Sequence, residues 1–156
     1  MIKGTLLKIV SKVALQPFYR QTRGLTLGTR TAVFDGQNRV LLVRPSYGLG
    51  WLLPGGGVER GETIFDSAKR EAREEAGIIA EEEPVLKGIC LNDGQFPGDH
   101  VAVLTLHKFT QAPWEPTLEI THAKFFAIDQ LPDGTTGGTR RRLDEIISNL
   151  EIARHW

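Results

Sequence analysis

The spacing of apolar residues changes along the chain from a helical period to a strand period. Within residues 2–16, apolar side chains recur at about 100° per residue and form one face, with Lys8 and Lys12 opposite. Pro17 ends this predicted helix. After residue 24 the pattern is typical of strands. The apolar face of the helix consists of Ile2, Leu6, Ile9, Val10 and Val13; strands are predicted at 29–34, 40–43, 85–91, 101–109 and 124–128.

The strongest helix signal covers residues 64–76, where alanines at every fourth position are separated by long charged side chains. Thr63 can cap its start together with Asp66, and Gly77 stands where a C-terminal glycine is expected. Phe65, Ala68, Ala72 and Ala76 form an apolar stripe that can pack on a sheet.

A second helix is predicted from residue 139 to about residue 150. Its first turn holds Arg140, Arg141 and Arg142, whose positive charges oppose the helix dipole. The simplest interpretation is a solvated face, and the alternative is a functional or packing reason for these arginines. Between the first two strands, residues 35–38 read Asp-Gly-Gln-Asn and predict a hairpin-type connection.

Strands on both sides of an acidic helix, with a further helix at the end, predict an α+β fold, an α/β/α sandwich with a mixed sheet. The order lacks the regular alternation of a dinucleotide-binding fold. We divide the chain into an N-terminal amphipathic extension, residues 1–24, and one domain, residues 25–156. Because the N-terminal helix is surplus to such a domain, we hypothesise that it mediates a homodimer.

Composition excludes several classes of protein. Nineteen Lys and Arg balance nineteen Asp and Glu among 156 residues, which argues against a dedicated nucleic-acid binder. The single cysteine, Cys90, excludes an intrachain disulfide and a multi-cysteine zinc site, and we expect it to fill space in a strand. No apolar run approaches the roughly 20 residues of a membrane span. We expect a cytoplasmic protein without a membrane span.

Charge is locally unbalanced between residues 59 and 83, which hold eight Glu and one Asp against four Lys or Arg. Glu71, Glu74 and Glu75 are spaced i, i+3 and i+4, so a helix places them on one face. Three such carboxylates repel one another unless cations compensate. Oxygen ligands of this kind suit Mg²⁺ or Mn²⁺ held together with substrate phosphates. The alternative is a solvated acidic helix, or one that serves only to recognise a partner.

A glycine-rich loop precedes the helix. Gly55, Gly56 and Gly57 allow backbone groups to approach a ligand where side chains would obstruct, so a loop carbonyl can join the carboxylates around a cation. A cation bridging two phosphate groups would offset their charge and orient a water for attack on phosphorus. The loop and helix together favour a metal site over a solvated face.

Residues 56–78 combine Gly56, Glu62 and the run Arg70-Glu71-Ala72-Arg73-Glu74-Glu75-Ala76-Gly77-Ile78 at fixed spacing. This segment resembles the Nudix box, the loop–helix–loop signature of the Nudix hydrolases. Ala72 stands where the signature has a bulkier aliphatic residue. Flanking segments are also similar to the family, namely Trp51 to Glu59 and, more loosely, Glu119 to Pro132.

The resemblance implies a Nudix-like fold and a pyrophosphohydrolase that acts on a nucleoside diphosphate derivative with Mg²⁺, with Mn²⁺ as the alternative cation. Glu71, Glu74 and Glu75 would be metal ligands, joined by the Gly56 carbonyl. Arg70 would hold the catalytic glutamate through a charge-assisted hydrogen bond. The residues implied to support the box are Glu62 and Gly77, and the candidates for deprotonating the attacking water are Glu71, Glu75 and Glu119.

The substrate stays open at this stage. ADP-ribose hydrolases of the family carry a proline shortly after the box, whereas Asp93 and Gly94 stand there, with Pro97 a few residues later. Aromatic side chains that could stack on a base and arginines that could contact phosphate are Tyr47, Trp51, Phe96, Trp114, Arg44 and Arg140. The competing hypothesis is a Nudix-fold module that binds or senses a nucleotide without consuming it.

Overall fold

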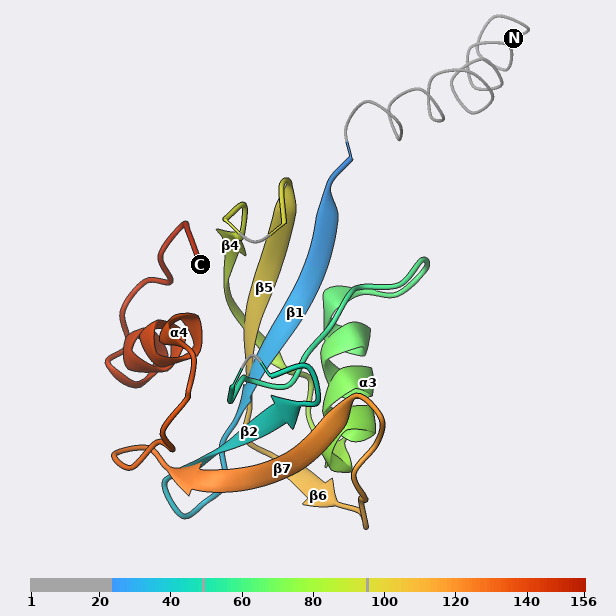
Figure 1. Ribbon diagram of the computed structural model, residues 1–156, viewed down its shortest axis with the longest axis vertical. Helices are drawn as coiled ribbons and strands as arrows, with labels where there is room; N and C mark the ends of the chain where they lie inside the picture. The colour runs from blue at the N-terminus through green and yellow to red at the C-terminus, as the bar shows by residue number, and fades with distance from the viewer. Residues whose placement is uncertain (1–23, 49, 95) are drawn as a thin grey trace, which may run out of the picture.

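The computed structural model describes residues 24–48, 50–94 and 96–156. In chain order the elements are β1 (Thr26–Val33), β2 (Arg39–Pro45), α3 (Ile64–Ala76), β3 (Ile78–Ala80), β4 (Val85–Leu91), β5 (Asp99–Leu106), β6 (Phe109–Gln111), β7 (Ile120–Ala127) and α4 (Gly137–Ile147) (Figure 1). The predicted N-terminal helix, and the homodimer hypothesis built on it, lie outside the described residues.

The main sheet is mixed, as predicted. β5 lies at its centre, paired in parallel with β1 and antiparallel with β4. β2 pairs antiparallel with β7, and β3 pairs antiparallel with β6.

The predicted hairpin is correct only at its turn. The Asp35 carboxylate accepts hydrogen bonds from the backbone N–H groups of Gln37 and Arg39, which closes the turn. Beyond the isolated bridge between Phe34 and Val40 the two strands diverge, because β1 pairs with β5 and β2 pairs with β7.

The two larger clusters of buried apolar residues lie on opposite sides of the strands. Ala72 and Ala76 of α3 pack with residues such as Leu41 and Val43 of β2. On the other side, Leu143 of α4 packs with Leu42 and residues from β1. Figure 1 shows α3 and α4 on opposite sides of β1 and β5. The predicted α+β sandwich is confirmed.

Helix α3 has the predicted bounds and caps. Thr63 and Asp66 form a capping box, and Gly77 adopts a left-handed conformation with φ of 69°. The buried face consists of Ser67, Ala68, Ala72 and Ala76. Small side chains let the helix lie close to the sheet, and Glu71 and Glu75 lie beside this buried face, next to Ala72 and Ala76.

The strand predicted at 101–109 is divided into β5 and β6. The Glu82 carboxylate accepts hydrogen bonds from the backbone N–H groups of His107 and Lys108, at 3.0 and 3.1 Å, where the strand is interrupted. The short strand β3 was not predicted, and β6 was predicted only at Phe109, since three residues are too few to show a period. The strand predicted around 124–128 begins earlier, at Ile120.

The interpretation of the three arginines of α4 as a solvated face is wrong for Arg142, which is 0% exposed. Its guanidinium donates to the Glu145 carboxylate at 2.7 Å and to the His155 carbonyl at 2.9 Å, and it lies over the Trp156 ring. The charge is buried because the C-terminal segment folds back over α4. Cys90 is buried beside it, as expected.

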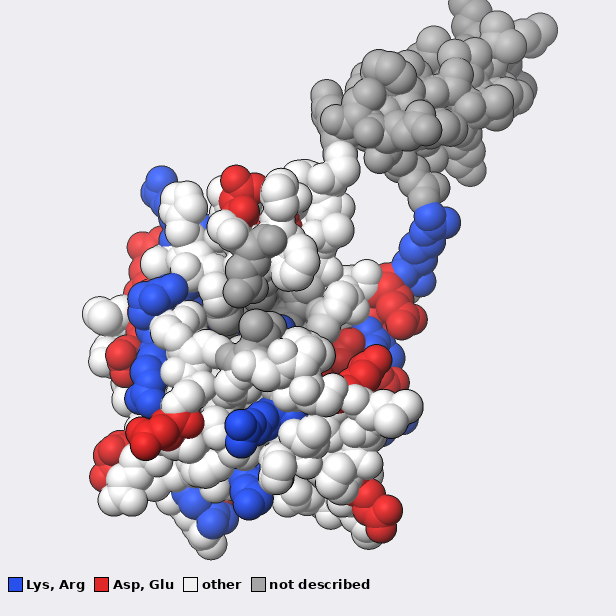
Figure 2. Space-filling model, in the orientation of Figure 1, with Lys and Arg blue, Asp and Glu red and all other residues white. Residues whose placement is uncertain are grey.

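Charges of both signs are spread over the face shown in Figure 2, and acidic side chains gather over α3 and the loop that precedes it. Among the helices of the described residues, none is long and apolar enough to cross a membrane.

Candidate functional site

The glycine-rich loop runs along β1 as an additional extended segment. Thr29 and Thr31 of β1 donate backbone hydrogen bonds to the carbonyls of Gly56 and Pro54, at 2.8 and 2.9 Å. A β-carbon at Gly55 would overlap the Thr29 carbonyl oxygen. Glycine is therefore required for the loop to lie this close to the strand.

Glu71 projects from α3 toward this loop. A β-carbon at Gly56 would lie 2.5 Å from Glu71 Oε1, so the missing side chain makes room for the carboxylate. The side chain of Glu71 is 14% exposed, and burial raises its pKa, an effect that the neighbouring Arg70 guanidinium partly offsets. Loop and helix are thus fitted to one another around this carboxylate.

Glu75 lies one turn further along the same face. Its Oε2 accepts a hydrogen bond from the backbone N–H of Gly55 at 2.8 Å. Burial raises the pKa of Glu75 to about 7, against the favourable effects of the Gly55 N–H and the Arg30 charge. The negative charges of Glu71 and Glu119 raise it further. A carboxyl group this strongly perturbed marks a candidate functional site.

Arg70 and Glu62 join the loop to the helix. Arg70 Nε and Nη2 donate to the two carboxylate oxygens of Glu62, at 2.7 and 3.1 Å, and Nη2 also donates to the Gly57 carbonyl. The hydrogen bond from Arg70 lowers the pKa of Glu62. Arg70 thus joins Glu62 and the Gly57 carbonyl to α3, and the supporting role that the resemblance implies for Glu62 stays a prediction.

Arg70 also faces the acidic residues of the helix. Its Nη1 donates to Glu71 Oε1 at 2.7 Å and to Glu74 Oε2 at 3.3 Å. The side chain of Glu74 is 53% exposed, far more than that of Glu71. Arg70 therefore supplies positive charge to two of the three glutamates.

A cleft of about 410 Å³ lies beside these carboxylates. One wall is α3, and the other is the segment that leads into β7. The lining residues are Glu71, Glu74, Glu75, Thr117, Leu118, Glu119 and Ile120. The structure thus brings Glu119, a candidate general base from a distant part of the chain, to the same cleft as the helix carboxylates.

The donors around the cleft fit Mg²⁺ or Mn²⁺, because carboxylate and carbonyl oxygens are the ligands that these cations prefer. The Gly56 carbonyl accepts one hydrogen bond from Thr29 and retains a second lone pair. Within the described ranges no three acidic, histidine or cysteine side chains already form a cation cluster. Instead, Arg70 pairs with Glu71 and Glu74, and Glu75 pairs with Gly55.

The predicted substrate residues lie outside the lining of this cleft. Trp51 packs edge-on against Phe126, with ring centroids 4.8 Å apart. Arg44 is exposed near the end of β2, opposite His122. Trp114 donates its indole N–H to the Glu74 carbonyl at 2.9 Å, which satisfies a carbonyl in the last turn of α3.

Arg30 was missed by the sequence analysis. Its Nη1 donates to the carbonyls of Leu53 and Gly55, at 2.9 and 3.0 Å, so it braces the loop from β1. The signal was a charged residue inside a strand, immediately before a run of buried residues from Thr31 to Phe34. Sequence alone does not show that this side chain reaches the glycines.

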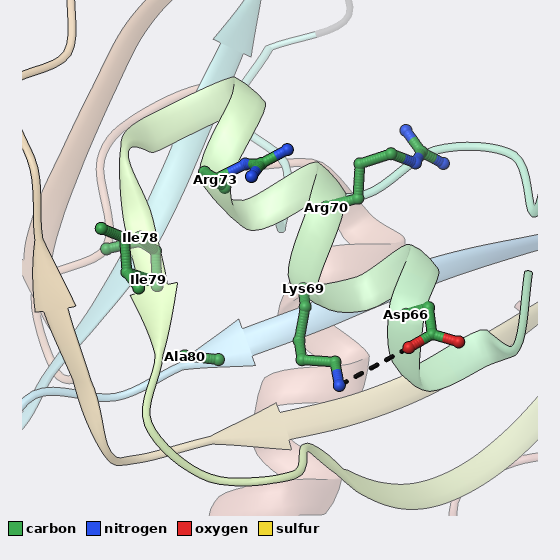
Figure 3. Close-up of a pocket in the computed structure, with 7 residues that line it drawn as sticks. All are labelled: Asp66, Lys69, Arg70, Arg73, Ile78, Ile79 and Ala80. Atoms are coloured by element: carbon green, nitrogen blue, oxygen red, sulfur yellow. Dashed lines mark ion pairs between the residues drawn. The ribbon is translucent and has the colours of Figure 1, made fainter.

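A second hollow, of about 320 Å³, is formed by α3 and β3 and is lined by Asp66, Lys69, Arg70, Arg73, Ile78, Ile79 and Ala80 (Figure 3). Lys69 lies 3.6 Å from Asp66 and 3.0 Å from Glu83. This second hollow has no glutamate in its lining, whereas four glutamates line the first cleft. We therefore assign the candidate cation site to the first cleft.

Comparisons with known proteins agree with this geometry. The chain is 31% identical over 106 residues to the Bacillus subtilis protein named "Putative ADP-ribose pyrophosphatase YjhB", covering 66% of this chain and 50% of that protein. It is 29% identical over 105 residues to the ADP-ribose pyrophosphatase of Methanocaldococcus jannaschii, covering 64% of this chain and 61% of that one. The chain thus spans about half to three-fifths of these relatives.

Among solved structures, the fold is similar to a MutT NUDIX hydrolase from Burkholderia pseudomallei, with a TM-score of 0.66 and 27% identity over 78% of this chain and 97% of that chain. An ADP-ribose pyrophosphatase from Streptococcus suis gives a TM-score of 0.58 and 26% identity, over 84% and 95% of the two chains. The family model for the NUDIX domain matches residues 24–146. The chain therefore belongs to the Nudix family.

Proposed function

We propose that this protein is a Mg²⁺-dependent pyrophosphohydrolase that cleaves the diphosphate linkage of a nucleoside diphosphate derivative. The observation that carries the proposal is the buried Glu75 carboxylate, held by the glycine-rich loop at one wall of an acidic cleft. A group whose pKa is near 7 is poised to gain or lose a proton, or to bind a cation, at neutral pH.

Glu71, Glu74, Glu75 and the Gly56 carbonyl are the groups that would hold the cation. When bound, Mg²⁺ supplies Lewis acidity that offsets the charge of the phosphate oxygens. Water attacks one phosphorus, the bond from that phosphorus to the bridging oxygen breaks, and the bridging oxygen leaves on the other phosphate. The proton lost by the water passes to a carboxylate, for which Glu71, Glu75 and Glu119 are the candidates.

Supporting residues fix this arrangement. Arg70, itself oriented by Glu62 and the Gly57 carbonyl, holds the Glu71 carboxylate by a charge-assisted hydrogen bond of 2.7 Å. Gly55 holds Glu75 in the same way from the loop. Positioning of this kind is worth large factors in rate, because small displacements of reacting groups are costly.

The names of two relatives and one solved structure favour an ADP-ribose-like substrate over nucleotide sugars, dinucleotides and nucleoside triphosphates. The absence of a proline at Asp93 or Gly94 does not support that choice, so all four classes belong in the test. The exposed cleft wall that precedes β7 is the place where the nonreacting part of the substrate would lie.

The test is a panel of these four substrate classes, incubated with Mg²⁺ and followed by chromatography of the products. Product should disappear with EDTA and in Glu75→Gln, but not in the control Glu81→Gln, whose carboxylate is exposed and outside the cleft lining. Turnover that ignores both EDTA and Glu75→Gln would refute the proposal. Tight binding without consumption of any member would support the nucleotide-sensing alternative instead.

A further inference from the structure

Arg30 makes contacts that no implied role of the Nudix box assigns. It lies near the middle of β1, which is paired along its length with β5, so its backbone is fixed by the sheet. Its Nη1 reaches out of the strand to two carbonyls of the glycine-rich loop, those of Leu53 and Gly55. The side chain is half-buried, and its hydrogen bonds show that it faces the loop from the sheet.

The two carbonyls flank one particular peptide unit. The Leu53 carbonyl belongs to the peptide before the Pro54–Gly55 peptide, and the Gly55 carbonyl belongs to the peptide after it. The N–H of the Pro54–Gly55 peptide is the group that donates to Glu75 Oε2 at 2.8 Å. One guanidinium nitrogen thus braces both neighbours of the peptide that holds the buried carboxylate.

This stretch of loop needs an external brace. Gly55, Gly56 and Gly57 have no side chains to restrict their backbone, and Gly55 has a φ of 152° that other residues rarely adopt. Pro54 has no N–H with which to anchor itself. The backbone N–H groups of Thr29 and Thr31 donate to the carbonyls of Gly56 and Pro54. Arg30 donates to the carbonyls of Gly55 and Leu53.

We propose that Arg30 is a positioning residue that orients the Pro54–Gly55 peptide, and through it the Glu75 carboxylate, for binding of the divalent cation. The inference rests on the proposed function for its catalytic consequence, but the effect on cation binding can be measured without substrate. Groups behind the ligands of a metal site typically alter affinity or activity by about 10- to 100-fold when removed.

The charge of Arg30 and its hydrogen bonds predict opposite results. As a positive charge near Glu71 and Glu75, Arg30 opposes the approach of a cation, so its removal would tighten binding. As a brace, it places the carboxylate correctly, and its removal would weaken binding. The sign of the change in affinity therefore separates the two roles.

The experiment compares Arg30→Met, Arg30→Lys and the control Arg39→Met. Arg39 is also an arginine on a strand, but it pairs with Asp35 at 2.7 Å, outside the cleft lining. Free Mn²⁺ is measured by electron paramagnetic resonance during titration of each protein without substrate, and kcat and KM are measured on the best substrate of the panel. Circular dichroism establishes which variants are folded.

We expect Arg30→Met to bind Mn²⁺ about tenfold more weakly and to lose about 100-fold in kcat, with little change in KM. Arg30→Lys keeps the charge, but its side chain is one atom shorter than the path to Arg30 Nη1, which donates both bonds, so it should resemble Arg30→Met more than the wild type. Arg39→Met should match the wild type. If Arg30→Met is unfolded, Arg30→Lys gives the same comparison alone.

Three results would overturn the inference: tighter Mn²⁺ binding by Arg30→Met, wild-type behaviour of Arg30→Lys, or a rise in KM with unchanged kcat, which would make Arg30 a direct substrate contact. A wild-type protein that consumes no member of the panel refutes the proposed function. The Mn²⁺ titration still decides the role of Arg30 in that case.

Discussion

Glu75 is expected to destabilise the cation-free protein at neutral and alkaline pH. Its carboxyl group is buried beside Glu71, and burial raises its pKa from 4.5 to about 7. The negative charge is therefore less favourable in the folded protein than in the unfolded chain. Replacing Glu75 by glutamine keeps the shape and an oxygen to accept the Gly55 N–H, but removes the charge.

The size of this destabilisation and its pH dependence follow from the difference between the pKa of Glu75 in the folded protein and in the unfolded chain. Below about pH 4.5 Glu75 is protonated in both states, so it carries no electrostatic penalty. As pH rises toward 7 the unfolded chain ionises first, and the folded state loses stability. Above about pH 7 the loss is constant at about 3 kcal/mol, since one pKa unit corresponds to about 1.4 kcal/mol.

Glu75→Gln should therefore raise the free energy of unfolding by up to about 3 kcal/mol near pH 8, and hardly at all near pH 4.5. For a domain of this size, that gain corresponds to about 10 °C in Tm. The assay is urea or thermal unfolding in EDTA at several pH values, with Glu81→Gln as the control. Added Mg²⁺ should stabilise the wild type more than the variant, because it binds the folded carboxylates.

A gain in stability that is the same at low and high pH would refute this reasoning, since it would come from packing or the unfolded state. A loss of stability near pH 8 would show that the hydrogen bond from Gly55 outweighs the burial of the charge. Equal stabilisation of wild type and variant by Mg²⁺ would show that Glu75 does not contact the cation.

Three further predictions concern the loop, the helix end and the C-terminal segment. Gly56→Ala should weaken Mn²⁺ binding and lower kcat, because the new β-carbon would lie 2.5 Å from Glu71 Oε1, whereas Gly57→Ala meets no atom within 4 Å and should bind Mn²⁺ normally. Trp114→Phe should lower stability by about 1 kcal/mol through loss of its indole hydrogen bond while leaving KM unchanged; a large rise in KM would show that Trp114 contacts substrate. Arg142→Met should cost about 3–5 kcal/mol in urea unfolding, because it leaves a buried carboxylate without its partner, and an unchanged midpoint would contradict the burial of this pair.

The parts of the fold that depend on neighbouring residues could be predicted from the sequence. The cap at Thr63, the alanine stripe and Gly77 fix the bounds of α3, because each acts within a few positions along the chain. The same local spacing predicts that Glu71, Glu74 and Glu75 share a face. The cleft itself also needs the wall that leads into β7, which comes from a distant part of the chain.

Pairing between distant segments could not be predicted in the same way. The turn after β1 is typical of a hairpin, but the parallel pairing of β1 with β5 joins residues more than seventy positions apart. Arg30 finds its acceptors in a loop outside its own strand, and Arg142 bonds the His155 carbonyl beyond the end of α4, although its partner Glu145 is a local one. Alternating patterns record which side chains are buried, and do not identify the strand or loop that buries them.

Burial is the main cause of the raised pKa of Glu75, and the distribution of counter-charge explains why it is offset less there than at Glu71. Arg70 is held by Glu62 and the Gly57 carbonyl, and from there it pairs with both Glu71 and Glu74. Glu75 has no such direct ion pair among the described residues. It accepts one backbone hydrogen bond, and the charge of Arg30 acts on it only by Coulomb attraction without a hydrogen bond. Without a cation, Glu75 should therefore be the glutamate of this cluster that is protonated, which reduces the repulsion among the three carboxylates. Binding of a divalent cation near neutral pH should release that proton.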